Sequence, residues 1–136
     1  WSLRDDVGKQ SQFGPTLMFD VSLPISQMEE YVANVNNNLN KYWTNFNFIV
    51  WGHLADGNLH LVAGVGDLQE KTIKKIERSV YDPLELIGGS VSAEHGIGIE
   101  KKPYLHLSRT KEEINYMKIL KKTFDPKMIL NPDLIF

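Results

Sequence analysis

The sequence predicts an α+β fold of the ferredoxin-like type, with the element order strand, helix, strand, strand, helix, strand. Three observations support this order: strict alternation of apolar and polar residues from Leu17, a hairpin signal at Asp56-Gly57, and helical periodicity over 28–43 and 73–84. We expect an antiparallel sheet with helices on one face, a second face free for a ligand, and a C-terminal helix and tail.

The first strand is predicted over 17–23, and Pro24 ends its pattern. Ser26 and Glu29 then have the spacing of a capping box, which predicts a helix start. This helix has an apolar stripe made of Met28, Val32, Val35, Leu39 and Tyr42 or Trp43.

The second predicted helix has a stripe at Ile73, Ile76, Val80 and Leu84. Asp82-Pro83 is expected to bend or break it, because proline lacks the backbone N–H that a helix interior needs. Residues 90–93 can form a short final strand.

The C-terminal helix is predicted from a second capping-box spacing, Thr110 with Glu113, and should end before Asp125-Pro126. Its stripe consists of Ile114, Met117, Leu120 and Phe124. The tail 128–136 is too apolar to be a free terminus, so we expect it to pack against other protein.

The hairpin signal brings two histidines together. If Asp56 and Gly57 are the central residues of a type I′ turn, His53 lies opposite His60, with Cβ atoms roughly 4.5–5.5 Å apart. Two imidazoles at that separation can bind one metal ion, but a protein site needs a third ligand. A pair of solvated strand histidines explains the pattern equally well.

A candidate third ligand follows the predicted last strand, in the segment Ala93-Glu-His-Gly-Ile-Gly98. No phosphate-binding glycine motif is present, so the glycines are expected to turn the backbone sharply. Glu94 could then complete a metal site, although a single glutamate is more often an ordinary exposed carboxylate.

Composition narrows the function classes. The chain has 136 residues, 42% of them hydrophobic, which suits one domain with one core. With 15 basic and 17 acidic residues and no basic cluster, we expect no nucleic-acid partner. There is no cysteine, which leaves histidine and carboxylate as metal ligands. We expect no transmembrane segment and, because the chain begins at Trp1, a piece of a longer protein.

Three motifs, in this order, resemble the C-terminal domain of the FAD-linked oxidase family. They are Gly52-His-Leu-Ala-Asp-Gly-Asn-Leu-His60, Ser92-Ala-Glu-His-Gly-Ile-Gly98 and Phe124-Asp-Pro-Lys-Met-Ile-Leu-Asn-Pro132. Segments 1–4 and 19–24 extend the resemblance over nearly the whole chain. Family members include D-lactate, glycolate and D-2-hydroxyglutarate dehydrogenases. The resemblance implies that residues 1–136 are the C-terminal part of the substrate (cap) domain and that the FAD-binding domain is absent from this chain.

The resemblance also implies roles for individual residues. His53, His60 and Glu94 would bind a divalent metal, commonly zinc, and His95 would be the general base. Arg4 matches an arginine that binds the substrate carboxylate, and Asn131 would lie towards the flavin. These roles fit oxidation of a D-2-hydroxy acid: the metal chelates the substrate, His95 takes the hydroxyl proton, and FAD accepts a hydride from C2.

Two positions depart from the pattern of D-2-hydroxyglutarate-type members. Met18 and Val62 stand where a lysine and an asparagine that hold a distal carboxylate are expected. The substrate is therefore expected to have an uncharged side chain.

Two other functions remain open at this level: a non-catalytic ferredoxin-like module that binds a metal or small ligand, and a metal-dependent hydrolase. The expected partners are a small 2-hydroxy acid and the missing FAD-binding domain, and a homodimer stays open. We expect an intracellular protein, cytoplasmic or mitochondrial.

Overall fold

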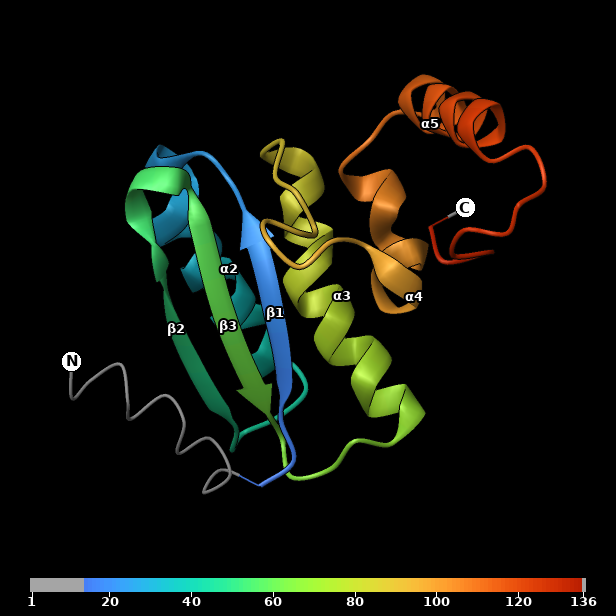
Figure 1. The fold of residues 1–136 in the computed structure, drawn as a ribbon. Coiled ribbons are helices and arrows are strands. Elements are labelled where there is room, and N and C mark those ends of the chain that lie inside the picture. Colours follow the sequence, from blue (N-terminus) through green and yellow to red (C-terminus); the bar gives the residue numbers. More distant parts are fainter. Residues whose placement is uncertain (1–13, 136) are drawn as a thin grey trace.

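The computed structural model describes residues 14–135 and confirms the α+β class. Three antiparallel strands, β1 (Leu17–Ser22), β2 (Asn47–His53) and β3 (Asn58–Gly64), pair in the order β1-β3-β2. Figure 1 shows helix α2 (Met28–Asn40) behind this sheet, with helix α3 (Glu70–Leu86) next to it. The short helix α4 (Gly98–Lys101) and helix α5 (Lys111–Phe124) follow; three 3₁₀ turns occupy Ile25–Gln27, Leu54–Asp56 and Lys102–Leu107.

The predicted fourth strand is reduced to one β-bridge. Ser90 pairs with Ser22 through two backbone hydrogen bonds, of 3.1 and 2.7 Å, which places it beside β1, where the last strand of a ferredoxin-like sheet belongs. Beyond that bridge, the N–H groups of residues 93–95 donate to the side chain of Asp20 instead of to a strand. The prediction of a strand over 90–93 is therefore wrong in extent, because a side chain replaces the neighbouring backbone as acceptor.

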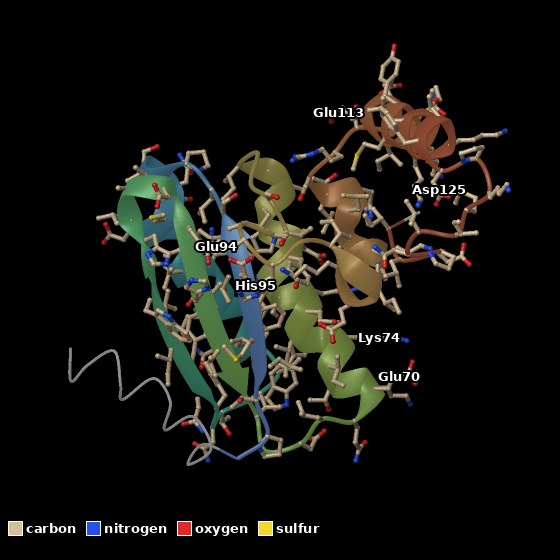
Figure 2. The ribbon with its side chains drawn as sticks, viewed as in Figure 1. Glu70, Lys74, Glu94, His95, Glu113 and Asp125 are labelled. Atoms are coloured by element: carbon tan, nitrogen blue, oxygen red, sulfur yellow. The ribbon has the colours of Figure 1, made fainter. Side chains whose placement is uncertain are left out.

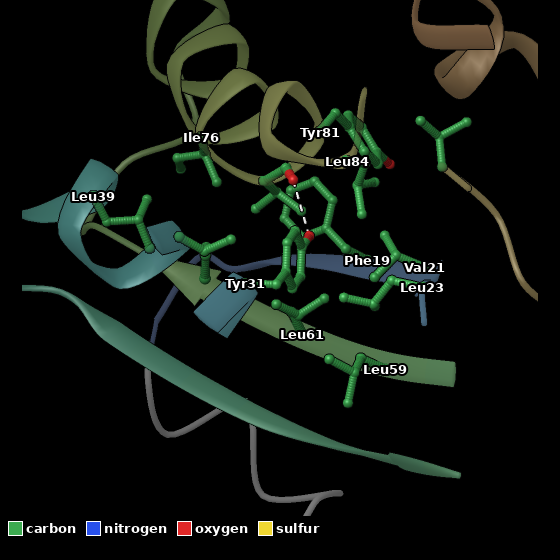
Figure 3. Packing of buried hydrophobic residues seen from close by; sticks show 14 of the residues in the cluster. Phe19, Val21, Leu23, Tyr31, Leu39, Leu59, Leu61, Ile76, Tyr81 and Leu84 are labelled. Atoms are coloured by element: carbon green, nitrogen blue, oxygen red, sulfur yellow. Dashed lines mark hydrogen bonds between the residues drawn. The ribbon is translucent and has the colours of Figure 1, made fainter. Parts of the chain in front are cut away.

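The hydrophobic core lies between the sheet and helices α2 and α3 (Figure 3). Phe19 and Val21 of β1 and Leu59 and Leu61 of β3 are buried there, as the alternation predicted. The hydroxyl of Tyr31 in α2 donates a buried 2.9 Å hydrogen bond to a carbonyl of α3 (Figure 3). The two helices are thus joined by a polar contact as well as by apolar packing.

The start of α2 differs from the prediction. Residues 25–27 form a 3₁₀ turn, closed by a hydrogen bond from the N–H of Gln27 to the carbonyl of Pro24. Ser26 therefore lies inside this turn and not at the N-cap, and no side chain caps α2. The predicted capping box at Ser26 is wrong.

Helix α3 continues through Pro83 to Leu86, so the predicted break does not occur. Pro83 has no N–H to give to the carbonyl of Ser79, four residues earlier. The side-chain amide of Asn38 in α2 lies 3.5 Å from that carbonyl and supplies a donor in place of the missing one. A neighbouring helix thus offsets part of the cost of an internal proline.

The hairpin between β2 and β3 has a different register from the predicted one. His53 pairs with Asn58, and His60 pairs with Trp51. The turn has four residues instead of two, a 3₁₀ turn followed by Gly57 in the left-handed conformation with φ of 69°. Relative to the predicted register the pairing has slipped by two positions, and because strand side chains alternate with period two, His53 and His60 still share a face.

Helix α5 has the predicted capping box, formed by Thr110 and Glu113, and ends before Asp125. None of its residues is buried, however, and Phe124 at its end is 81% exposed. The tail that follows is also exposed, Ile129 by 71%. The packing partner predicted for this apolar surface is not found among residues 14–135.

Within those residues, no helix has both the length and the apolar character required to cross a bilayer.

Candidate functional site

Residues from three separate segments converge on the sheet face opposite α2. His53 ends β2, His60 lies in the middle of β3, and Glu94 belongs to the loop that follows the Ser90 bridge (Figure 2 labels Glu94 beside the strands). One carboxylate oxygen of Glu94 lies 3.8 Å from Nε2 of His53, and the other lies 3.8 Å from Nε2 of His60. The rings of His53 and His60 lie edge to face, with their centroids 5.6 Å apart.

This donor set fits a divalent metal ion. One ligand atom from each of His53, His60 and Glu94 lies within 4.8 Å of the other two. Zinc ligands about 2.1 Å from the metal at tetrahedral angles are about 3.4 Å apart, so small side-chain rotations would close the site. His53 and Glu94 are more than half exposed, and His60 is only 13% exposed. Two histidines and a glutamate that open to solvent match a catalytic zinc site, which keeps a coordination position free.

His95 lies next to this set of ligands. Its ring stacks with that of His60 at a centroid distance of 6.0 Å, and its side chain is exposed (Figure 2). Gly96 and Gly98, with φ of 78° and 56°, turn the chain away directly afterwards, as predicted. The loop therefore presents a carboxylate and an imidazole together, and the imidazole is free to contact a ligand.

Asp20 of β1 holds this loop in place, a role that its position does not predict, since alternation over 17–23 puts it with Met18 and Ser22 on the side away from the apolar residues. Its Oδ2 accepts hydrogen bonds from the N–H groups of Ala93, Glu94 and His95, at 3.1, 2.8 and 2.9 Å. Burial alone would raise the pKa of Asp20, but these hydrogen bonds and the charge of Lys101 outweigh it, so that the pKa is lowered. Asp20 is thus an ionised carboxylate beneath the site. A correct strand register would have placed Asp20 beside the site, because Asp20 pairs directly with His60 across β1 and β3.

Lys101 accompanies this buried charge. The two lysines before Pro103 predict a solvated turn over 101–103. That prediction is wrong for Lys101, which is buried in α4, with Nζ 3.1 Å from Oγ of Ser92 and 3.8 Å from Oδ2 of Asp20. Burial lowers the pKa of Lys101, and the negative charge of Asp20 opposes that shift. The opposite charges of Asp20 and Lys101 leave the buried region beneath the loop with a net charge close to zero.

Met18 and Val62 lie on the same face, further along the strands. They pair directly across β1 and β3, and Val62 is two residues beyond His60. Met18 is exposed and Val62 is fully buried. Asn58 pairs with His53 at the other end of this face, and its buried side chain has no hydrogen-bond partner in the described part of the chain.

Asn131 is not part of this group. It belongs to the exposed tail after α5, a segment that Figure 1 shows on the side of α4 away from the sheet, and it has a left-handed φ of 46°. Arg4 lies outside the described residues.

A comparison with protein families identifies the domain. Residues 1–135 match the model of the FAD-linked oxidases, C-terminal domain. The chain belongs to this family. Among curated family relatives, the D-2-hydroxyglutarate dehydrogenase of Stutzerimonas stutzeri is 31% identical over the whole chain and 30% of its own length.

Two further relatives are described as mitochondrial enzymes. The mitochondrial D-2-hydroxyglutarate dehydrogenase of Danio rerio is 35% identical over 97% of the chain and 25% of its own length. A putative mitochondrial D-lactate dehydrogenase of Schizosaccharomyces pombe is 37% identical over 84% of the chain and 23% of its own length. The chain therefore spans less than a third of the length of these relatives.

Proposed function

We propose that this chain is the substrate- and metal-binding part of an FAD-dependent dehydrogenase that oxidises a D-2-hydroxy acid to the 2-oxo acid. The observation that carries the proposal is the convergence of His53, His60 and Glu94 with His95 adjacent on the same loop. Family membership supplies the flavin, which the missing FAD-binding domain would hold. In this proposal residues 1–136 are the C-terminal part of the substrate domain.

His95 is the general base. A cation held by His53, His60 and Glu94, which we propose to be zinc, would lower the pKa of a chelated substrate hydroxyl. His95 lies beside these ligands and takes the hydroxyl proton on its ring, while the O–H electron pair forms the new C2=O bond. Bound FAD would supply the acceptor for the C2 hydrogen, which would leave with its electron pair as a hydride, so that the acid would be oxidised and the flavin reduced. From the family resemblance, Arg4 pairs with the substrate carboxylate and Asn131 lies towards the flavin.

The substrate side chain would lie along the strands beyond His60. Met18, which is exposed, and Val62, which is buried beside it across β1 and β3, offer no charge or hydrogen bond there. Burying an unpaired carboxylate beside them would cost several kcal/mol. We therefore propose an uncharged, apolar side chain, as in D-lactate or a longer aliphatic acid, although two of the relatives above are named for D-2-hydroxyglutarate.

The test separates metal binding from proton transfer in the full-length protein. Glu94→Ala and His60→Ala should lower metal content and turnover together, because each removes a ligand. His95→Asn should keep the metal and reduce turnover at least about 100-fold, the usual scale for a lost general base. His106→Asn, at an exposed histidine of the last 3₁₀ turn, is the control and should change neither.

Elemental analysis and steady-state kinetics on the same preparations give the result. Normal turnover in His95→Asn would disprove the assignment of the base. Unchanged metal content in both ligand variants would disprove the metal site.

A further inference from the structure

Asp20 lies next to two parts of the site, His60 of β3 and the loop that carries Glu94 and His95, but it is not one of the three candidate ligands. Its Oδ2 accepts the three N–H groups of residues 93–95, the segment that carries Glu94 and His95. Its Oδ1 is buried without a hydrogen-bond partner among the described residues and lies 3.7 Å from Nδ1 of His60. That distance is longer than a hydrogen bond. It nevertheless places Oδ1 of Asp20 next to the ring nitrogen of His60 that points away from Glu94.

The two nitrogens of His60 have different neighbours. Nε2 lies 3.8 Å from Glu94, and Nδ1 faces Asp20. A neutral imidazole carries one proton, and a carboxylate can only accept, so Asp20 favours the tautomer with the proton on Nδ1. That tautomer leaves the lone pair of Nε2 directed towards His53 and Glu94, where a metal ligand is needed.

We propose that Asp20 is the positioning residue of this site, which fixes the tautomer of His60 through Oδ1 and the place of Glu94 and His95 through Oδ2. This inference rests on the proposed function, since it assigns the metal to Nε2 of His60. Asp20 touches neither the metal nor the substrate. Its side chain is 1% exposed, so solvent does not compete for either oxygen.

The decisive variant is Asp20→Asn, which keeps the shape of the side chain. Its single carbonyl oxygen is needed by the three N–H groups of the loop, so its NH₂ group would face Nδ1 of His60. An NH₂ group donates, and Nδ1 must then accept, which moves the proton of His60 to Nε2 and blocks that atom as a ligand. We expect metal affinity to fall about 10- to 100-fold, the usual effect of losing a group that orients a ligand.

Asp125→Asn is the matched control. Asp125 is also a buried aspartate that accepts two backbone N–H groups, from Ile129 and Leu130, and pairs with a lysine, Lys121. It lies after α5 and contacts no histidine of the site in the described chain. Its loss should leave metal affinity unchanged, which separates the effect on His60 from the general cost of removing a buried carboxylate.

Two measurements on the full-length protein test the proposal: competition between protein and a chromophoric chelator for Zn²⁺, and ¹⁵N shifts of labelled histidines in the metal-free protein. Wild type should show His60 protonated on Nδ1, and Asp20→Asn should show it protonated on Nε2 with weakened zinc binding. Unchanged zinc affinity in Asp20→Asn, or an unchanged tautomer, would overturn the proposal. So would a second bound zinc that Asp20→Asn alone removes, because Asp20 would then be a ligand, together with His60 and His95.

The tautomer also separates this inference from the proposed function. If wild type bound no zinc, the metal site would be wrong, but the ¹⁵N shifts of the same metal-free samples would still decide whether Asp20 sets the tautomer of His60.

Discussion

Gly57 and Leu23 are held together backbone to backbone. The N–H of Leu23 donates to the carbonyl of Gly57 at 2.9 Å, and a Cβ atom added to Gly57 would lie 2.6 Å from the carbonyl oxygen of Leu23. This contact ties the tip of the β2-β3 hairpin to the end of β1. The hairpin carries two of the candidate ligands, and β1 carries Asp20.

Replacing Gly57 with alanine should therefore cost more than the strain of a left-handed backbone alone. Gly66 is the matched control, since it also has a positive φ, of 94°, but has no atom within 4 Å of an added Cβ. We expect Gly66→Ala to lower the free energy of unfolding by about 1 kcal/mol and Gly57→Ala by clearly more. Urea unfolding of both variants gives the comparison; equal losses would show that the Leu23 contact does not constrain the hairpin.

Tyr31→Phe tests the polar link between α2 and α3. The change removes one buried hydrogen bond, to the carbonyl of Val80, and should lower the free energy of unfolding by about 1 kcal/mol. Tyr42→Phe is the control, because Tyr42 is 55% exposed, and its change should have almost no effect. If both variants unfold at the wild-type urea concentration, the hydrogen bond makes no net contribution.

The tail should loosen in acid. The hydrogen bond from Lys121 lowers the pKa of Asp125, burial opposes this, and the N–H groups of Leu130 and Ile129 lower it further. Because the folded pKa is below the ordinary value of 3.8, the stabilisation is complete above that value and is lost as pH falls through the lowered pKa. Protection factors for the amide protons of Ile129 and Leu130 should fall below about pH 4 in wild type. In Asp125→Asn they should be low throughout and should not follow this pH dependence.

Substrate selection can be tested at the Met18 and Val62 pair. The full-length enzyme should have a higher kcat/KM for D-lactate or a longer aliphatic acid than for D-2-hydroxyglutarate or malate, since the pair cannot solvate a distal carboxylate. Met18→Lys combined with Val62→Asn should shift the ratio towards the dicarboxylic acids. A wild-type preference for D-2-hydroxyglutarate would mean that a residue outside this chain supplies the distal charge.

The isolated chain should neither bind FAD stably nor turn over substrate, because we propose that a domain outside residues 1–136 holds the flavin. The purified chain should show no flavin absorption, even after incubation with FAD. A yellow protein that retained flavin through gel filtration would contradict this prediction.

Sequence periodicity predicted what depends on alternation within one element. It placed Phe19 and Val21 in the core, put His53 and His60 on one face, and located the capping box of Thr110. His53 and His60 share a face although the predicted turn type is wrong, because a slip of two positions in the pairing leaves the alternation of side chains unchanged.

What the sequence did not predict depends on contacts between distant segments. Asp20 looked like a polar residue on a strand face, and its role arises from N–H groups more than 70 positions away. Lys101 looked solvated because its partner is that same buried carboxylate. At Pro83 the missing donor is partly replaced by Asn38 of another helix, which the helix propensities of the residues around Pro83 do not indicate.

The four-residue turn between β2 and β3 has a consequence for the order of folding. His53 and His60 belong to one hairpin, and hairpins of this kind form in roughly microseconds. We expect Glu94 to reach them later, once α3 has docked and the following loop has bound Asp20, because contacts that span a long stretch of chain form more slowly. We therefore expect a nascent chain to present His53 and His60 together before Glu94 reaches them, and a metal ion captured at that stage would be held weakly and would exchange until the loop closes.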